Sequence, residues 1–302
     1  MATRTQAPGL VDPTATPPDP ASAPAGRSRR ITPGRVINYV LLVIVGLIFL
    51  IPLYWLLTAA LKPSAEIYSW PLSFFPRSLE LGNFVQAWSS APFGRYLVNS
   101  AIITLGGAAL KLVLAVLTAY AFAYLPFPGK KVLFLLMLGA LMVPGHVTLL
   151  INFITVGRLG LVNSYLGIIL PGVASAFGTF LLRQHFLTLP GEVLEAAELD
   201  GAGHVRRLIS FVVPMARPAV ITVALLALID EWNGFIWPLI ATNSDEMRTL
   251  TIGLLFLKAN EGVDNWGAIM AGTIFVVTPM LVLFLIARRY IVSGLAGASM
   301  SR

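Results

Sequence analysis

The chain has 302 residues, of which 57% are hydrophobic and only 12% are charged, and this composition excludes an ordinary soluble protein. Its formal net charge is +7, but Lys and Arg flank apolar runs and form no continuous basic face, so nucleic-acid binding is not expected. Cysteine is absent, which excludes disulfides and thiolate metal sites. We therefore expect an integral membrane protein.

Residues 1–35 are rich in Pro, Ala, Thr and Ser and cannot bury enough apolar surface to fold, so they are predicted to form a disordered tail. The apolar run at 36–61 follows basic residues, as the core of a signal peptide does. It is much longer than a signal-peptide core of about 7–15 residues, and it lacks a convincing small-residue cleavage site. We interpret it as an uncleaved membrane anchor.

Further apolar runs follow, each long enough for a helix of roughly 20 residues that crosses a bilayer core of about 30 Å. Such a run satisfies its own backbone hydrogen bonds as a helix, whereas the strands of a membrane barrel alternate over about 10 residues. The sequence thus predicts an all-α fold with six transmembrane helices within residues 36–291, followed by a tail at 292–302. The runs after the first lie at 96–125, 132–153, 162–182, 219–241 and 267–287.

Basic residues at the ends of these runs predict the orientation in the membrane. If six spans alternate, one side collects most of the Lys and Arg, and that side is expected to be cytoplasmic. Both ends of the chain, and the loop at 190–218 between the fourth and fifth spans, would then be cytoplasmic. The residues on this side are Arg27, Arg29, Arg30, Arg35, Lys130, Lys131, Arg183, Arg206, Arg207, Arg288 and Arg289.

The loop at 190–218 is predicted to fold as a helix-turn-helix elbow. Residues 192–199 are strong helix formers with acidic side chains near the positive end of the helix dipole. Gly201 and Gly203 would end this helix, so that a second one runs from 204 to 213 at an angle. Its mixture of apolar and acidic side chains suits either a groove on a partner protein or the membrane surface. The apolar face would be formed by Val193, Leu194, Ala197 and Leu208.

Charged residues inside the predicted spans mark a candidate pathway, because ionised groups in a membrane are costly unless they face water or a partner. Asp230, Glu231, Trp232 and Asn233 lie in the fifth span, where carboxylates beside an aromatic ring suit sugar recognition. Alternatively, Trp232 and Asn233 secure helix packing. Lys111 lies deep in the second span and either pairs with Asp230 or Glu231 or faces a polar subunit interface.

Signals for catalysis are missing from the sequence. His146, His185 and His204 are scattered without metal-ligand spacing, and there is no GxxxxGK[ST] phosphate-binding loop. We expect no catalytic residue, metal or cofactor in this chain, and no ATP hydrolysis by it.

Two loops on the opposite side of the membrane have distinct compositions. The loop at 242–266 carries charged residues around a short apolar stretch and is predicted to fold as a small cap. The loop at 62–95 mixes aromatic residues with prolines, which suits contact with lipid headgroups.

The elbow resembles the EAA loop of ABC importer permeases. The resemblance is carried by Glu195-Ala196-Ala197, Asp200-Gly201-Ala202, Leu208, Phe211 and Val213-Pro214. The likeness extends from about residue 37 to the C-terminus, and the branch is similar to the second membrane subunit of maltose-type carbohydrate importers. Further matching segments are Leu61-Lys62-Pro63, Asn99-Ser100, Ala119-Tyr120-Ala121-Phe122, Met142-Val143-Pro144, Thr179-Phe180-Leu181-Leu182-Arg183, Trp232-Asn233, Pro238-Leu239 and Arg289-Tyr290.

This resemblance implies a type I permease fold whose coupling helices, between spans four and five, bind an ATPase. Glu195 would form an ionic contact with a basic residue of the ATPase, while Ala196 and Ala197 pack in its groove. Gly201 would permit the bend and Asp200 would buttress it. The chain departs from the family after Gly297-Ala298, where Ser299 follows instead of a lysine, so contact of the tail with the ATPase is not expected.

By the same resemblance, the partners would be a second permease, an ATPase dimer, an extracytoplasmic solute-binding protein, a sugar and membrane lipid. The expected function is import of a sugar or oligosaccharide across the inner (cytoplasmic) membrane by alternating access. The alternative is a self-contained secondary transporter or channel, in which Lys111, Asp230 and Glu231 form an ion relay. Such a protein would need no docking elbow, and we see no internal repeat of the kind it often shows.

Overall fold

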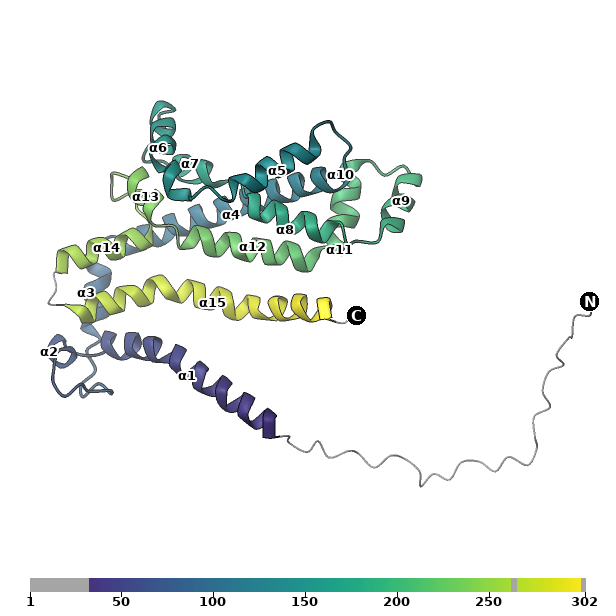
Figure 1. Ribbon diagram of the computed structural model, residues 1–302. Helices are drawn as coiled ribbons and strands as arrows, with labels where there is room; N and C mark the ends of the chain where they lie inside the picture. Colours follow the sequence, from purple (N-terminus) through teal and green to yellow (C-terminus); the bar gives the residue numbers. More distant parts are fainter. Residues whose placement is uncertain (1–32, 262–264, 300–302) are drawn as a thin grey trace, which may run out of the picture. The chain divides into compact units, whose positions relative to one another are not determined.

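The computed structural model describes residues 33–261 and 265–299, and every regular element in that part of the chain is a helix (Figure 1). Contacts divide the chain into residues 1–51 and 52–302, a boundary that falls within α1 (Pro33–Ala60). The predicted disordered tail lies almost wholly outside the described residues. The packing discussed below belongs to residues 52–302.

Three described helices are long and apolar enough to cross a membrane unaided. They are α1, α4 (Phe93–Tyr124) and α15 (Trp266–Ser299), which correspond to the predicted first, second and sixth spans. The backbone of α15 continues as a helix to Ser299, well past the predicted start of a tail at 292.

The predicted third and fourth spans are not continuous helices. The first of them consists of α5 (Lys130–Ala140), a 3₁₀ turn and α6 (Leu149–Arg158), with a bend of 93° at the break. Pro144 lies in this break with extended backbone angles, and proline interrupts a helix because it has no N–H to donate. The second consists of α7 (Tyr165–Ile169), a 3₁₀ turn containing Pro171, and α8 (Ala176–Phe186), with a bend of 49°.

The predicted fifth span is also interrupted. Its first part, α12 (Arg217–Trp232), ends just after Asp230 and Glu231, and Gly234 follows in the break. A short helix, α13 (Ile236–Ala241), completes the run. Continuous apolar composition therefore did not reveal these breaks, which occur where Pro or Gly interrupts the run.

The core around the C-terminal half of α4 is formed by contacts of α4 with α8 and α12, which run beside it in Figure 1. Ala115 and Ala119 of α4 are fully enclosed, and their small side chains let the helices approach closely. Leu182 and Phe186 of α8 and Val223 of α12 fill the space between the backbones.

A second core lies at the N-terminal end of α4. It joins α4 to α3 (Gly82–Ser89), α14 (Leu250–Glu261) and α15, with Phe93 and Tyr96 at its centre. The side-chain amide of Asn99 donates to the backbone carbonyls of Glu246 and Arg248, both at 2.8 Å. Over its described residues up to 261, the predicted cap is held to α4 by these bonds and continues into α14.

The loop at 62–95 is more ordered than its composition indicates, because it contains α2 (Ser64–Ile67) as well as α3. Lys62 at the start of this loop is completely enclosed. Its Nζ donates to the Ser73 carbonyl at 2.5 Å and lies 4.8 Å from the Trp55 ring. Trp70 and Phe75 of the same loop are exposed, and contact with lipid headgroups stays a prediction for them.

Candidate functional site: an acidic elbow and a buried ion triad

The first arm of the elbow is α9 (Gly191–Leu199), which starts after Pro190 and closely matches the predicted helix. The helix ends because Gly201 adopts a φ of +76°, in the left-handed region that glycine tolerates best. The backbone N–H groups of Gly201 and Ala202 then donate to the carbonyls of Glu198 and Ala197, at 3.0 and 2.9 Å. These bonds satisfy carbonyls at the helix end, so the turn is a defined structure.

The second arm begins at His204, as predicted, but it is not one regular α-helix. It consists of α10 (His204–Arg207), a π-helical turn (Leu208–Val212) and α11 (Val213–Met215), which contains Pro214. A bend of 87° then leads into α12, which turns the elbow away from the fifth span.

The apolar face of the elbow packs against its own chain. Leu194, Ala197 and Leu208 are buried, and two of them, Leu194 and Leu208, join the core around α4, α8 and α12. Ala197, which was expected to pack in a partner's groove, is only 3% exposed within this chain. Ala202 is buried as well.

The outer face of the elbow is acidic and partly apolar. Glu195, Ala196 and Asp200 are exposed, as is Pro214 in the second arm. Asp200 caps α9 through its backbone N–H, which donates to the Ala196 carbonyl at 3.0 Å. The exposed large apolar side chains on this elbow are Val193, Leu199, Val205 and Ile209, so Val193 does not belong to the buried face on which the sequence placed it.

Two basic residues contact the C-terminal end of α4, close to the elbow. Lys130 Nζ donates to the Leu125 carbonyl at 3.0 Å, and Arg183 Nε donates to the Phe122 carbonyl at 3.0 Å. Carbonyls in the last turn of a helix lack partners within the helix and carry the negative end of its dipole. Residues that the sequence assigned to one side of the membrane thus gather at one end of α4.

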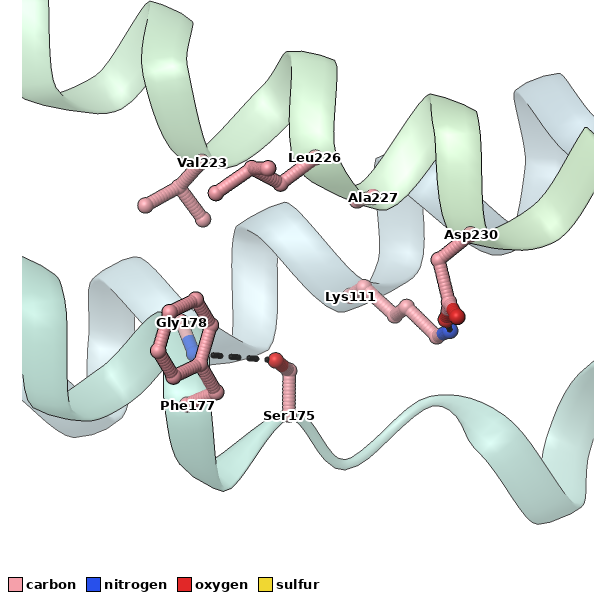
Figure 2. A pocket seen from close by; sticks show the side chains of 8 residues that line it. All are labelled: Lys111, Ser175, Phe177, Gly178, Val223, Leu226, Ala227 and Asp230. Atoms are coloured by element: carbon pink, nitrogen blue, oxygen red, sulfur yellow. Dashed lines mark hydrogen bonds and ion pairs between the residues drawn. The ribbon is translucent and has the colours of Figure 1, made fainter.

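A triad of charges joins α4 to the end of α12. Lys111 Nζ lies 2.5 Å from Asp230 Oδ2 and 2.9 Å from Glu231 Oε1 (Figure 2 shows the Asp230 contact). The side chains of Lys111 and Glu231 are 11% and 12% exposed, whereas that of Asp230 is 72% exposed. The sequence left the partner of Lys111 open, and the structure pairs it with both carboxylates.

Gly107 makes room for this triad, whereas Gly172 only lies beside it. A Cβ atom at Gly107, one turn before Lys111 on α4, would lie 2.6 Å from the Glu231 carboxyl carbon. At Gly172 a Cβ would lie 3.7 Å from Lys111 Cε, within ordinary contact. The absence of a side chain at Gly107 lets the carboxylate approach the backbone of α4.

Two cavities share Lys111 and Asp230. One, of about 290 Å³, extends past Ser175 and Phe177 at the start of α8, as Figure 2 shows. The other, of about 330 Å³, includes Glu231, Asn152 and Trp237. Charged, amide, hydroxyl and aromatic side chains therefore surround the same pair of residues.

The other two predicted pathway residues do not line either cavity. Trp232 is 8% exposed, and its Nε1 donates to the Val276 carbonyl of α15 at 3.1 Å. Its role in helix packing, the alternative left open by the sequence, is the one that the structure favours. Asn233 is exposed just beyond the end of α12. The aromatic residue beside the triad is Trp237, which sequence reasoning did not single out.

Comparison with known families decides the class of protein. The family described as "Binding-protein-dependent transport system inner membrane component" matches residues 111–296, which include the triad, the elbow and most of α15. The chain belongs to this family. It is a permease subunit of an ABC importer, not an enzyme, and the alternative of a self-contained secondary transporter is therefore dropped.

Curated relatives of the permease are similar over nearly their whole length. The sn-glycerol-3-phosphate transport system permease protein UgpE of Pectobacterium atrosepticum is 32% identical over 86% of this chain and 95% of its own. The diacetylchitobiose uptake system permease protein NgcG of Streptomyces coelicolor is 32% identical over 91% of each chain. The arabinooligosaccharides transport system permease protein AraQ of Halalkalibacterium halodurans is 33% identical over 83% of this chain and 91% of its own.

A solved structure shares the fold. It is a chain of a bacterial ABC transporter involved in the import of the acidic polysaccharide alginate. It aligns with a TM-score of 0.74 over 84% of this chain and 95% of its own, at 22% sequence identity. The similarity supports the fold of an importer permease for the arrangement of helices described above.

Proposed function

We propose that this permease carries a sugar or oligosaccharide into the cell by alternating access, and that a separate ATPase drives it through the elbow. The observation that carries the proposal is the construction of the elbow. Its inner face is anchored in the core by Leu194 and Leu208, while Glu195 and Ala196 face outward from a turn fixed by Gly201. Such a surface is rigid and open to a partner.

The proposed topology has six spans. Three helices cross alone, and the bent pairs α5–α6 and α7–α8 are each long and apolar enough to form one more crossing. The remaining crossing would be formed by α12 and α13, which follow the elbow. Lys130 and Arg183 at the C-terminal end of α4 favour a cytoplasmic location for that end. The elbow and both ends of the chain would then be cytoplasmic, and the cap at 242–266 would face outward.

The elbow must transmit force if it is to couple ATP hydrolysis to transport. Moving a two-state equilibrium from 1:99 to 99:1 requires roughly 5.5 kcal/mol of differential interaction, and a mobile loop would absorb part of that by bending. We assign Glu195 an ionic contact with a basic residue of the ATPase, and Ala196 a place against its surface. Ala197 and Ala202 are buried on the inner side and support this contact from behind.

The proposed assembly contains this permease, a second permease, an ATPase dimer and an extracytoplasmic solute-binding protein. Membership of the family supports the binding protein and the ATPase. A second permease would close the pathway on the side where Asp230 is exposed. A carboxylate in a membrane requires water or a polar partner, and a cavity between two permeases supplies both.

The triad and its two cavities form this subunit's part of the proposed pathway. Sugars offer hydroxyl groups to polar side chains and apolar ring faces to aromatic rings. Asn152, Ser175 and Trp237 provide these groups beside Lys111 and Asp230. Two of the relatives are permeases for diacetylchitobiose and for arabinooligosaccharides, which supports a saccharide cargo.

The experiment that tests the proposal reverses one charge on the elbow. Glu195→Lys places a cation against a basic surface, so it should abolish both uptake and cargo-stimulated ATP hydrolysis while the complex still inserts into the membrane. Gly201→Asp should do the same by straining the left-handed turn. The measurements are cargo uptake by cells and ATP hydrolysis by the purified complex.

A control variant lies on the same helix. Glu192→Lys makes the same charge change at an exposed position of α9 outside the motif, and it should keep uptake close to that of the unmodified permease. Normal uptake by the Glu195→Lys permease would contradict the proposed role of the elbow. The ligand of the associated binding protein, identified by mass spectrometry, tests the cargo separately, and glycerol phosphate would contradict a saccharide.

A further inference from the structure

An ion pair joins the two arms of the elbow across the glycine turn. Arg207 Nη1 of α10 lies 2.6 Å from Glu198 Oε2 of α9. The side chain of Arg207 is only 13% exposed, although it lies on an otherwise exposed helix. This contact adds to the hydrogen bonds of the glycine turn in restricting the angle between the two arms.

Arg207 also reaches the main bundle. Its Nη2 lies 2.8 Å from His204 Nδ1, and because a guanidinium nitrogen only donates, His204 is the acceptor. The hydroxyl of Tyr120 on α4 lies 3.3 Å from the same Nδ1, and the two rings meet edge to face. One guanidinium group thus contacts α9 directly and α4 through His204.

The helix reached in this way is the one that carries Lys111. Tyr120 and Lys111 lie on α4, with roughly 13 Å of helix between them at about 1.5 Å per residue. Lys111 in turn holds Asp230 and Glu231 at the end of α12. A displacement of the elbow therefore has a continuous route of contacts, through one stiff helix, to the side chains around the two cavities.

We propose that Arg207 is a positioning residue, which fixes the angle between the elbow arms and passes movement of the elbow to α4 through His204 and Tyr120. The inference rests on the proposed coupling function of the elbow. An arginine suits this role better than a lysine, because its planar fork offers two nitrogens to two acceptors at once. Contact alone does not establish coupling, so the test must measure coupling itself.

The measured quantity is the cargo taken up per ATP hydrolysed by the intact complex in proteoliposomes. Arg207→Gln should lower this ratio by about tenfold, within the usual range of coupling energies, while the ATPase still co-purifies. Arg206→Gln is the matched control, because it removes the same charge from the next residue of α10, whose side chain is exposed. It should change the ratio by less than about twofold.

Two further variants separate positioning from simple stabilisation. If Arg207 and Glu198 act as a unit, Glu198→Gln combined with Arg207→Gln should lower the ratio no further than Arg207→Gln alone. Tyr120→Phe removes only the hydroxyl that meets His204, and it should lower the ratio in the same direction. A merely structural Arg207 would instead reduce the amount of assembled complex and leave the ratio unchanged.

The inference is overturned if the Arg207→Gln and Arg206→Gln permeases take up the same amount of cargo per ATP hydrolysed. It is also overturned if Tyr120→Phe leaves this ratio unchanged. Its failure can be told apart from failure of the proposed function. If Glu195→Lys abolishes uptake and Arg207→Gln does not alter the ratio, the elbow couples without this residue. If Glu195→Lys transports normally, the coupling role of the elbow itself falls.

Discussion

At the residue scale, the ion triad shows how a charge is kept in an apolar bundle. Lys111 has 11% of its side chain exposed and offers one ammonium group to two carboxylates. Removing the cation would leave Glu231 buried without its counter-charge. Breaking a buried ion pair in this way commonly costs about 3–5 kcal/mol. The triad therefore stabilises the contact between α4 and α12.

We predict that Lys111→Met lowers the free energy of unfolding of the permease by about 3 kcal/mol. Adding Glu231→Gln to Lys111→Met should recover part of that loss, because a neutral amide replaces the unpaired carboxylate. Lys131→Met is the control, since Lys131 is exposed at the start of α5. Denaturant unfolding in detergent measures all three, and equal stabilities for Lys111→Met and Lys131→Met would rule the prediction out.

The residue types of the site were readable from the sequence, but their partners were not. Lys111, Asp230 and Glu231 were identifiable because ionised residues are rare in apolar spans. Trp237 was missed because a single aromatic residue in a span carries no signal of its own. The pairing of Arg207 with Glu198 was missed because it crosses a turn, where helix spacing rules do not apply.

At the scale of elements, glycines decide how closely helices approach. The Glu231 carboxyl group lies over Gly107, where a methyl group would be 2.6 Å from its carbon atom. At Gly139 of α5 a Cβ would meet nothing within 4 Å. These two positions, both inside helices, therefore separate a packing effect from the ordinary helix preference of alanine.

We predict that Gly107→Ala destabilises the permease by about 1–3 kcal/mol through overpacking, because the α4–α12 contact must open or Glu231 must leave Lys111. Gly139→Ala should be neutral or should stabilise by up to about 1 kcal/mol, since alanine is the better helix former and space is available. Thermal unfolding of the two variants in the same detergent compares them. A Gly107→Ala permease as stable as the Gly139→Ala one would contradict the described contact.

Elements were predicted well where local chemistry decides them and poorly where it does not. The start of α9 after Pro190, its end at Gly201 and the new start at His204 follow from capping and glycine rules. The breaks within the third, fourth and fifth spans were missed, because a hydropathy run does not register a helix break as long as the flanking residues stay apolar. Pro144, Pro171 and Gly234 were the available signals, one in each span.

At the scale of the whole molecule, the account joins three parts of residues 52–302 through α4. The cap is fixed to its N-terminal end by Asn99, the triad lies at Lys111, and the elbow meets it at Tyr120. Composition predicted the membrane class, and the acidic motif predicted the family. Neither could show that one helix contacts all three parts, because those contacts link residues far apart in the sequence.

The most direct test of the central claim asks what the elbow touches. The permease contains no cysteine, so Ala196→Cys introduces a unique thiol on the exposed face of α9, and Asn243→Cys does so on the cap as a control. With a thiol-to-amine crosslinker in native membranes, the account predicts that position 196 crosslinks to the ATPase subunit and position 243 does not. A crosslink to the ATPase from position 243, with none from position 196, would contradict it.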